Sequence, residues 1–110
     1  MFTKHNPKAY RPLLPGIQMR TLVYGEKSLL AEFHLGAGSQ LPRHAHPYEQ
    51  TGYLVSGHMR LTIDDTVNDI EPGDAWSIPM DVPHSAEIIE DSVAVEVFSP
   101  VREDYLPEKP

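Results

Sequence analysis

Apolar and polar residues alternate along most of this chain with a period of two. In residues 28–35, for example, Leu29, Ala31, Phe33 and Leu35 have the same parity, so they would lie on one face of a β-strand. The same alternation, divided by Gly, Pro and Asp turns, predicts strands at residues 17–24, 28–35, 48–55, 58–63, 67–70, 75–78, 85–89 and 93–98. Because no ten-residue stretch shows helical periodicity, we expect an all-β domain built as a sandwich or closed barrel.

The two ends of the chain lack this alternation and are rich in proline. Residues 1–16 hold three prolines and predict an N-terminal extended arm with little structure of its own. Residues 17–98 are the predicted β-barrel. Residues 99–110, again with three prolines, predict a C-terminal tail that packs near the barrel mouth.

Composition narrows the classes of protein that fit. At 110 residues the chain is long enough for one hydrophobic core but not for two. The formal net charge is −7 and the basic residues form no cluster, which argues against a nucleic-acid partner. The absence of cysteine excludes disulfides, thiolate metal sites and cysteine nucleophiles. No segment resembles a signal peptide or a membrane span, so we expect a cytoplasmic protein without a membrane partner.

Two histidines separated by one residue are the first candidate for chemistry. On an extended chain His44 and His46 point to the same side, about 7 Å apart. Gln50 has the same parity, and His84 begins another predicted strand that a barrel can bring opposite. An isolated pair of this kind is more often a surface feature, but the other two residues favour a site for one divalent transition metal. Imidazole and amide ligands suit Zn, Ni, Fe or Mn and do not distinguish among them.

The spacing of these residues resembles that of the cupins. The pattern G-x5-H-x-H-x3-Q-x6-G over residues 38–57 is similar to the first cupin motif, with glutamine where many members have glutamate. The pattern P-G-D-x3-I-P-x3-P-H over residues 72–84 is similar to the second. The resemblance implies a single-domain cupin β-barrel, which is an antiparallel double-stranded β-helix of the jelly-roll type, and a homodimer. It does not imply one activity, because cupins include enzymes and binding proteins.

A third motif narrows the resemblance. The pattern E-x-F-S-P-x-R-E-D-Y-L over residues 96–106 is similar to the C-terminal segment of the KdgF-type pectin-degradation cupins, which open the ring of 4,5-unsaturated uronates. That family has an acidic residue, usually aspartate, at the position of Glu96, and a phenylalanine and an arginine at those of Phe98 and Arg102. Its metal ligands are two histidines, a glutamine and a later histidine, which implies the ligand set His44, His46, Gln50 and His84 here.

The side-chain chemistry of Glu96, Phe98 and Arg102 also indicates a binding site at the barrel mouth. Glu96 and Phe98 share one face of the last predicted strand, so both can point into the barrel. Arg102 on the tail can fold over the mouth and bind a carboxylate through two parallel hydrogen bonds. Glu96 near a metal can transfer a proton, and Phe98 supplies an apolar wall. The alternative is a surface ion pair between Glu96 and Arg102, which would contribute little.

Three functions remain open from the sequence. The first is a metal-dependent enzyme that opens 4,5-unsaturated uronates, the breakdown products of pectin and alginate, to linear keto-sugar acids. Its catalytic residues would be Glu96 and Arg102, and its partner a small anionic sugar bound by Arg102 and Phe98. The second is a non-catalytic module that binds a sugar acid or a metal. The third is a small-molecule dioxygenase, although the ligand set lacks the carboxylate of the common iron triad.

Overall fold

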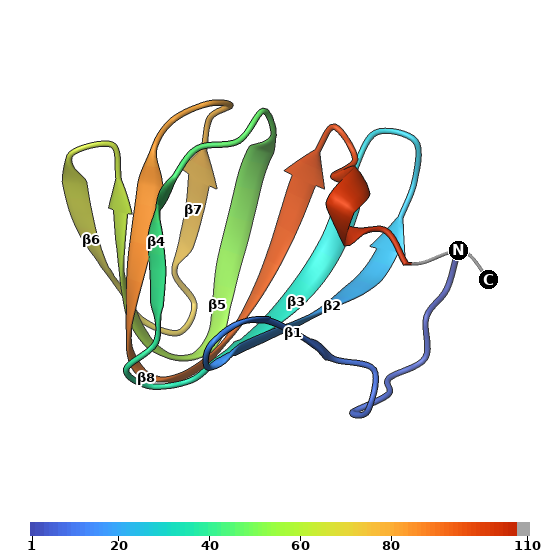
Figure 1. Cartoon of the computed structure of the whole chain (residues 1–110), viewed down its shortest axis with the longest axis horizontal. Helices are drawn as coiled ribbons and strands as arrows, with labels where there is room; N and C mark the ends of the chain where they lie inside the picture. Colours follow the sequence, from blue (N-terminus) through green and yellow to red (C-terminus); the bar gives the residue numbers. More distant parts are fainter. Residues whose placement is uncertain (108–110) are drawn as a thin grey trace.

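The computed structural model describes residues 1–107 and confirms an all-β chain. The strands are β1 (Arg11–Leu14), β2 (Ile17–Tyr24), β3 (Leu29–Leu35), β4 (Gln40–His44), β5 (Glu49–Ile63), β6 (Thr66–Ile70), β7 (Ala75–Ile78) and β8 (His84–Ser99), and a short 3-10 helix, η1 (Glu103–Tyr105), follows them. All pairings between these strands are antiparallel. Figure 1 shows them curling around a common interior.

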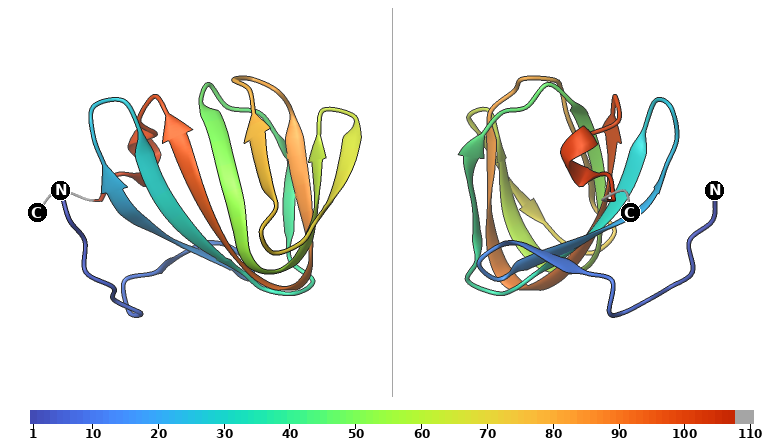
Figure 2. Two further views of the ribbon diagram at one scale, coloured as in Figure 1. Left: turned by 180° about the vertical axis from the view of Figure 1, so that it is seen from behind. Right: turned by 45° about the vertical axis from the view of Figure 1, so that its right-hand side comes forward.

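Two long strands, β5 and β8, belong to both layers of the fold. In one layer, the second half of β8 pairs with β3 on one side and with the first half of β5 on the other. Strand β7 pairs with β5, and β2 and then β1 follow β3 at the opposite edge. The first half of β8 pairs with β4 and with the second half of β5, which continues to β6. This is the predicted jelly-roll arrangement, and the right-hand view of Figure 2 looks into its interior.

Gly57 allows β5 to pass from one layer to the other. Its φ angle of 99° lies in the region that favours glycine. A Cβ atom at this position would lie 2.2 Å from Ser92 Oγ and 2.5 Å from the Asp91 carbonyl oxygen. The pairing of β5 with β8 is irregular at the same place. The glycine therefore permits both the backbone turn and the close approach of β8.

The core lies between the layers and follows the predicted alternation. In β3, the residues at the positions of Leu29, Ala31, Phe33 and Leu35 are buried, while those between them are partly exposed. The inner face of β8 alternates in the same way through Ala86, Ile88, Ala94 and Phe98. Burial of these side chains, at roughly 25 cal/mol per Å² of apolar area, is the main stabilising contribution.

The structure corrects the prediction at the strand boundaries and at the chain ends. Strands predicted at 48–55 and 58–63 form one strand, β5, and those at 85–89 and 93–98 form β8. Strands β1 and β4 were not predicted, because each contains a proline and lies at an edge.

The arm expected at residues 1–16 therefore contains β1, which pairs with β2. The predicted tail contains η1, and its last part, residues 108–110, lies outside the described residues. Within residues 1–107, no helix has the length and apolar character needed to cross a membrane.

Candidate metal centre

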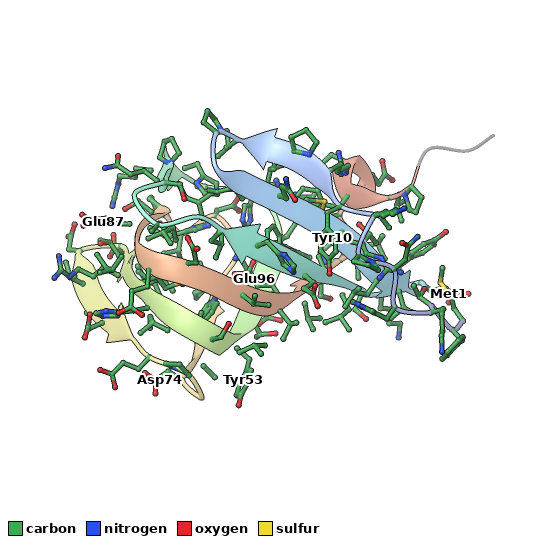
Figure 3. The ribbon with its side chains drawn as sticks, turned by 90° about the horizontal axis from the view of Figure 1, so that it is seen from below. Met1, Tyr10, Tyr53, Asp74, Glu87 and Glu96 are labelled. Atoms are coloured by element: carbon green, nitrogen blue, oxygen red, sulfur yellow. The ribbon has the colours of Figure 1, made fainter. Side chains whose placement is uncertain are left out.

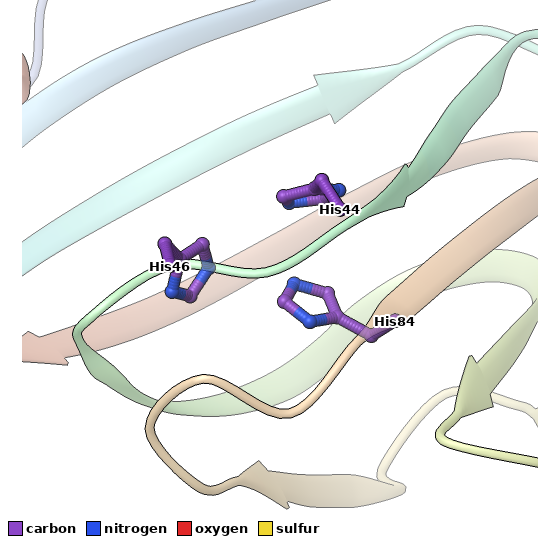
Figure 4. Close-up of side chains that lie close together, drawn as sticks. All are labelled: His44, His46 and His84. Carbon is purple, nitrogen blue, oxygen red and sulfur yellow. The ribbon is translucent and has the colours of Figure 1, made fainter.

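Three of the predicted metal ligands, His44, His46 and His84, lie close together (Figure 4). His44 ends β4, His84 begins β8, and the two are cross-strand partners. His46 lies in the loop after β4. The ring centroids are 4.3 Å apart for His44 and His84, 4.9 Å for His46 and His84, and 5.5 Å for His44 and His46. One nitrogen atom from each ring lies within 4.8 Å of the others.

Backbone hydrogen bonds fix the loop between β7 and β8, which leads into His84, against the His46 loop and against the turn after β5. The Asp81 N–H donates to the His46 carbonyl oxygen at 2.9 Å, and the Asp64 N–H donates to the Pro83 carbonyl oxygen at 2.8 Å. The loop that carries His46 is therefore tied to the loop that leads into β8. Strand pairing positions the third histidine, His44.

Each imidazole has one nitrogen engaged with an oxygen acceptor. Nδ1 of His44 lies 2.7 Å from the Pro42 carbonyl oxygen, and Nδ1 of His84 lies 2.9 Å from the Val82 carbonyl oxygen. Nε2 of His46 lies 2.9 Å from Gln50 Oε1. Since a carbonyl oxygen requires a donor, these nitrogens carry the protons and the opposite nitrogens carry lone pairs.

Those lone pairs fit a divalent transition metal. Nδ1 of His46 and Nε2 of His84 are buried and have no hydrogen-bond partner within residues 1–107. Burial lowers the pKa of both His46 and His84, with a smaller contribution from neighbouring positive charge, so both rings favour the neutral form that binds metal. His44, His46 and His84 would hold such an ion through one nitrogen each, and these three atoms lie within 4.8 Å of one another.

Gln50 joins this cluster to the carboxylate of Glu96. The Gln50 side chain is 8% exposed, its Oε1 faces His46 Nε2, and its Nε2 donates to Glu96 Oε2 at 2.5 Å. An amide can accept at one end and donate at the other, which a carboxylate cannot do. Metal coordination by Gln50 stays a prediction, because the oxygen atom that would coordinate the ion accepts the hydrogen bond from His46 Nε2 at 2.9 Å.

The Glu96 carboxyl group lies in the interior, although the residue as a whole is partly exposed. Burial raises its pKa to about 7, even though contacts with Gln50, Arg102 and Trp76 lower it. Phe98 follows on the same face of β8 and is 1% exposed. The inward orientation predicted for both side chains is therefore confirmed.

The raised pKa of Glu96 predicts a pH-dependent stability. In the metal-free folded chain, Glu96 stays protonated well above its ordinary pKa of 4.5. Below pH 4.5 the group is protonated in both the folded and the unfolded chain, so it causes no loss of stability there. As the pH rises through about 7, the buried group ionises and the wild type should lose up to about 3 kcal/mol relative to Glu96→Gln. Urea unfolding at pH 5 and pH 8 measures this difference. An equal gap between the two proteins at both pH values would contradict it.

Arg102 reaches the same interior from the tail. Its Nε donates to both carboxylate oxygens of Asp104, at 3.0 and 3.2 Å, and its guanidinium lies 3.9 Å from the centre of the Tyr105 ring and 5.2 Å from that of Phe98. The Arg102 side chain is only 17% exposed. Its ion-pair partner within the described chain is Asp104, so the surface pair with Glu96 that we considered is not formed.

The predicted site residues other than His46 line one cavity. Its polar lining comes from His44, Gln50, His84, Ser85, Glu96 and Arg102, and Phe98 and Tyr105 are among its apolar walls. The cavity volume is about 50 Å³, which holds an ion and a water but not a sugar. The sequence prediction missed Tyr105 and Asp104, because both lie beyond the last strand, where no periodicity indicates which side chains are buried.

Similarity to known proteins agrees with this geometry. Residues 31–100 match the family described as the cupin domain. The pectin degradation protein KdgF of Dickeya dadantii is 25% identical over 93 residues, which cover 83% of this chain and 84% of that protein.

Two solved structures superpose over nearly the whole chain. The structure of KdgF from a Halomonas species has a TM-score of 0.91 and 27% identity, with 96% of this chain and 98% of that one covered. An RmlC-like cupin from Shewanella frigidimarina has a TM-score of 0.90 and 23% identity, with 96% and 95% covered, and shows the fold alone. The chain therefore belongs to the cupin family, and within that family it is similar to the KdgF proteins.

Proposed function

We propose that this cupin is a metal-dependent enzyme that opens the ring of 4,5-unsaturated uronates to give linear keto-sugar acids. The observation that carries the proposal is the convergence of three kinds of group on one cavity. These are imidazole lone pairs, a carboxyl group with a pKa of about 7, and the guanidinium of Arg102. The similarity to two proteins named KdgF, one described as a pectin degradation protein, supports the choice of substrate class.

The reaction is an isomerisation that needs one proton moved from oxygen to carbon. The substrate contains a hemiacetal at C1 and an enol ether between C4 and C5. Opening breaks the bond between C1 and the ring oxygen, removes the C1 hydroxyl proton and delivers a proton to C4. The product has an aldehyde at C1 and a ketone at C5, and no oxidant or further reactant is required.

Glu96 is the group that moves the proton. A carboxyl group with a pKa of about 7 is present in both protonation states near neutral pH, so it can accept the hydroxyl proton and return it to carbon. The Gln50 amide fixes one of its oxygens. When bound to His44, His46 and His84, a divalent metal supplies Lewis-acid stabilisation of a substrate oxygen.

Arg102 binds the uronate carboxylate. Asp104 accepts from Nε, and the Tyr105 ring supports the face of the guanidinium. No hydrogen bond within residues 1–107 occupies the two terminal amino groups, so they can form a bidentate contact. The 50 Å³ cavity is smaller than the ~300–1,000 Å³ of ligand pockets, so the tail segment that carries Arg102 has to shift when a sugar enters.

The competing function is binding without turnover. A stand-alone module would retain the metal and the Arg102 contact but would leave the substrate unchanged. The test is the absorbance of the conjugated enol ether after the zinc-loaded protein is mixed with lyase-digested pectin. Loss of absorbance at substrate in large excess over protein supports the enzyme. Binding at one equivalent with the absorbance retained supports the module.

Replacing Arg102 with lysine should mainly raise KM. Lysine keeps the positive charge but cannot form two parallel hydrogen bonds to a carboxylate. Loss of about 2 kcal/mol corresponds to a KM roughly 30-fold higher. Steady-state kinetics measure this change, and metal content should stay at the wild-type level. An unchanged KM would show that Arg102 does not contact the substrate.

Replacing Gln50 with glutamate should separate metal affinity from turnover. The added negative charge near the cluster strengthens metal binding. A carboxylate at this position cannot donate to Glu96 and repels it at short range, so kcat/KM should fall by at least about 10-fold. Metal Kd and kcat/KM are measured with the same metal. If kcat/KM matched or exceeded the wild-type value, the neutral amide would have no catalytic role.

A further inference from the structure

The one tryptophan of the chain, Trp76, lies next to Glu96. It is in β7 and is 8% exposed, and its indole N–H forms no hydrogen bond of standard geometry within residues 1–107. A buried donor without an acceptor destabilises the folded chain. Neither the packing of the ring nor the proposed reaction explains why this N–H is buried here.

Strand register places Trp76 in line with Glu96. Gly52 of β5 is the cross-strand partner of Trp76 on one side and of Glu96 on the other. A Cβ atom added to Gly52 would lie 2.2 Å from Cε2 of the indole and 2.4 Å from its Nε1. The indole therefore occupies the space where any other residue would place its side chain, and its N–H edge crosses β5 toward β8.

We infer that Trp76 is a positioning residue for Glu96, with the indole N–H donating across Gly52 to the Glu96 carboxylate. Gln50 already donates to Oε2, which leaves Oε1 for the indole. The indole N–H is close enough to Glu96 to lower the pKa of the carboxyl, which supports the contact. Two donors on opposite sides would fix the orientation of the carboxylate, and glycine at position 52 is required for one of them. The catalytic part of this inference rests on the proposed function.

Two substitutions separate the N–H from the packing of the ring. Trp76→Phe keeps an aromatic ring and loses the donor, whereas Gly52→Ala keeps the donor and displaces the ring. Both should lower kcat by roughly 10-fold, because the carboxylate is no longer held in one orientation. KM and metal content should stay close to the wild-type values in Trp76→Phe, because Trp76 is not among the residues that line the cavity.

The contact itself can be tested without activity. Because the chain has one tryptophan, the ¹⁵N-labelled, zinc-loaded protein gives a single indole N–H resonance. This resonance should shift in Glu96→Gln. It should not shift in Glu87→Gln, which removes an exposed carboxylate from the other end of the same strand; Figure 3 labels both glutamates.

Each outcome bears on the inference. An indole resonance unchanged in Glu96→Gln would overturn the contact, and wild-type kcat in Trp76→Phe would overturn the positioning role. If Trp76→Phe does not fold, the indole resonance in Glu96→Gln still tests whether Trp76 contacts Glu96. If the wild type does not open the ring, the proposed function fails, while the resonance still shows whether Trp76 binds Glu96.

Discussion

Glu96→Gln is expected to lower kcat for ring opening by about 10²–10⁴-fold, which is the contribution of a general acid–base group. Glutamine has nearly the same shape, and its oxygen can still accept from the Gln50 amide, so the interior should stay packed. It cannot carry a proton from the C1 hydroxyl to C4. Steady-state kinetics on a 4,5-unsaturated uronate should therefore show a large loss in kcat with little change in KM.

The matched control for this substitution is Glu87→Gln. Glu87 also lies on β8, but its carboxylate is exposed and faces Arg60 at 3.8 Å. The control should keep wild-type kinetics. Wild-type kcat in Glu96→Gln would assign the proton transfer to another group.

His84→Ala is expected to remove both bound metal and activity. Nε2 of His84 is buried, and within residues 1–107 the one hydrogen bond of the ring is that from Nδ1 to the Val82 carbonyl oxygen. The substitution therefore removes one ligand and leaves the contact between Gln50 and Glu96 intact. Since the loss of residues that merely support a ligand costs 10–100-fold in metal affinity, loss of the ligand itself should cost at least about 100-fold.

Elemental analysis after metal loading measures this effect. The wild type should hold close to one ion per chain and His84→Ala close to none. His5→Ala, which changes an exposed histidine outside the cluster, should match the wild type. Equal metal content in His84→Ala and wild type would contradict the assignment of the three histidines.

The fold was predictable because alternation and turn residues are local properties of the sequence. The inner faces of β3 and β8 follow the predicted parity, and the two motifs around His44 and His84 indicated the family before the strands were paired. Strand lengths were less predictable. Gly57 appeared to end a strand, whereas in the structure it bends β5 as the strand passes between layers.

The supporting contacts of the site could not be predicted, because they depend on which strands become neighbours. Trp76, Gly52 and Glu96 are far apart in sequence and meet only through the register of β7, β5 and β8. The hydrogen bond from Arg102 to Asp104 is local, but nothing in the alternation pattern indicates that the tail turns back into the barrel. The sequence therefore predicts the groups that carry the chemistry more readily than those that orient them.

The central claim is that this cupin converts an unsaturated uronate rather than only binding it. The most direct test is a proton NMR time course of the unsaturated uronate monomer with the zinc-loaded protein at a small molar fraction of the substrate. The olefinic C4 proton signal should disappear as signals of the open-chain keto acid appear, and a chelator should stop the conversion. An olefinic signal that persists after prolonged incubation with metal-loaded protein would contradict the claim.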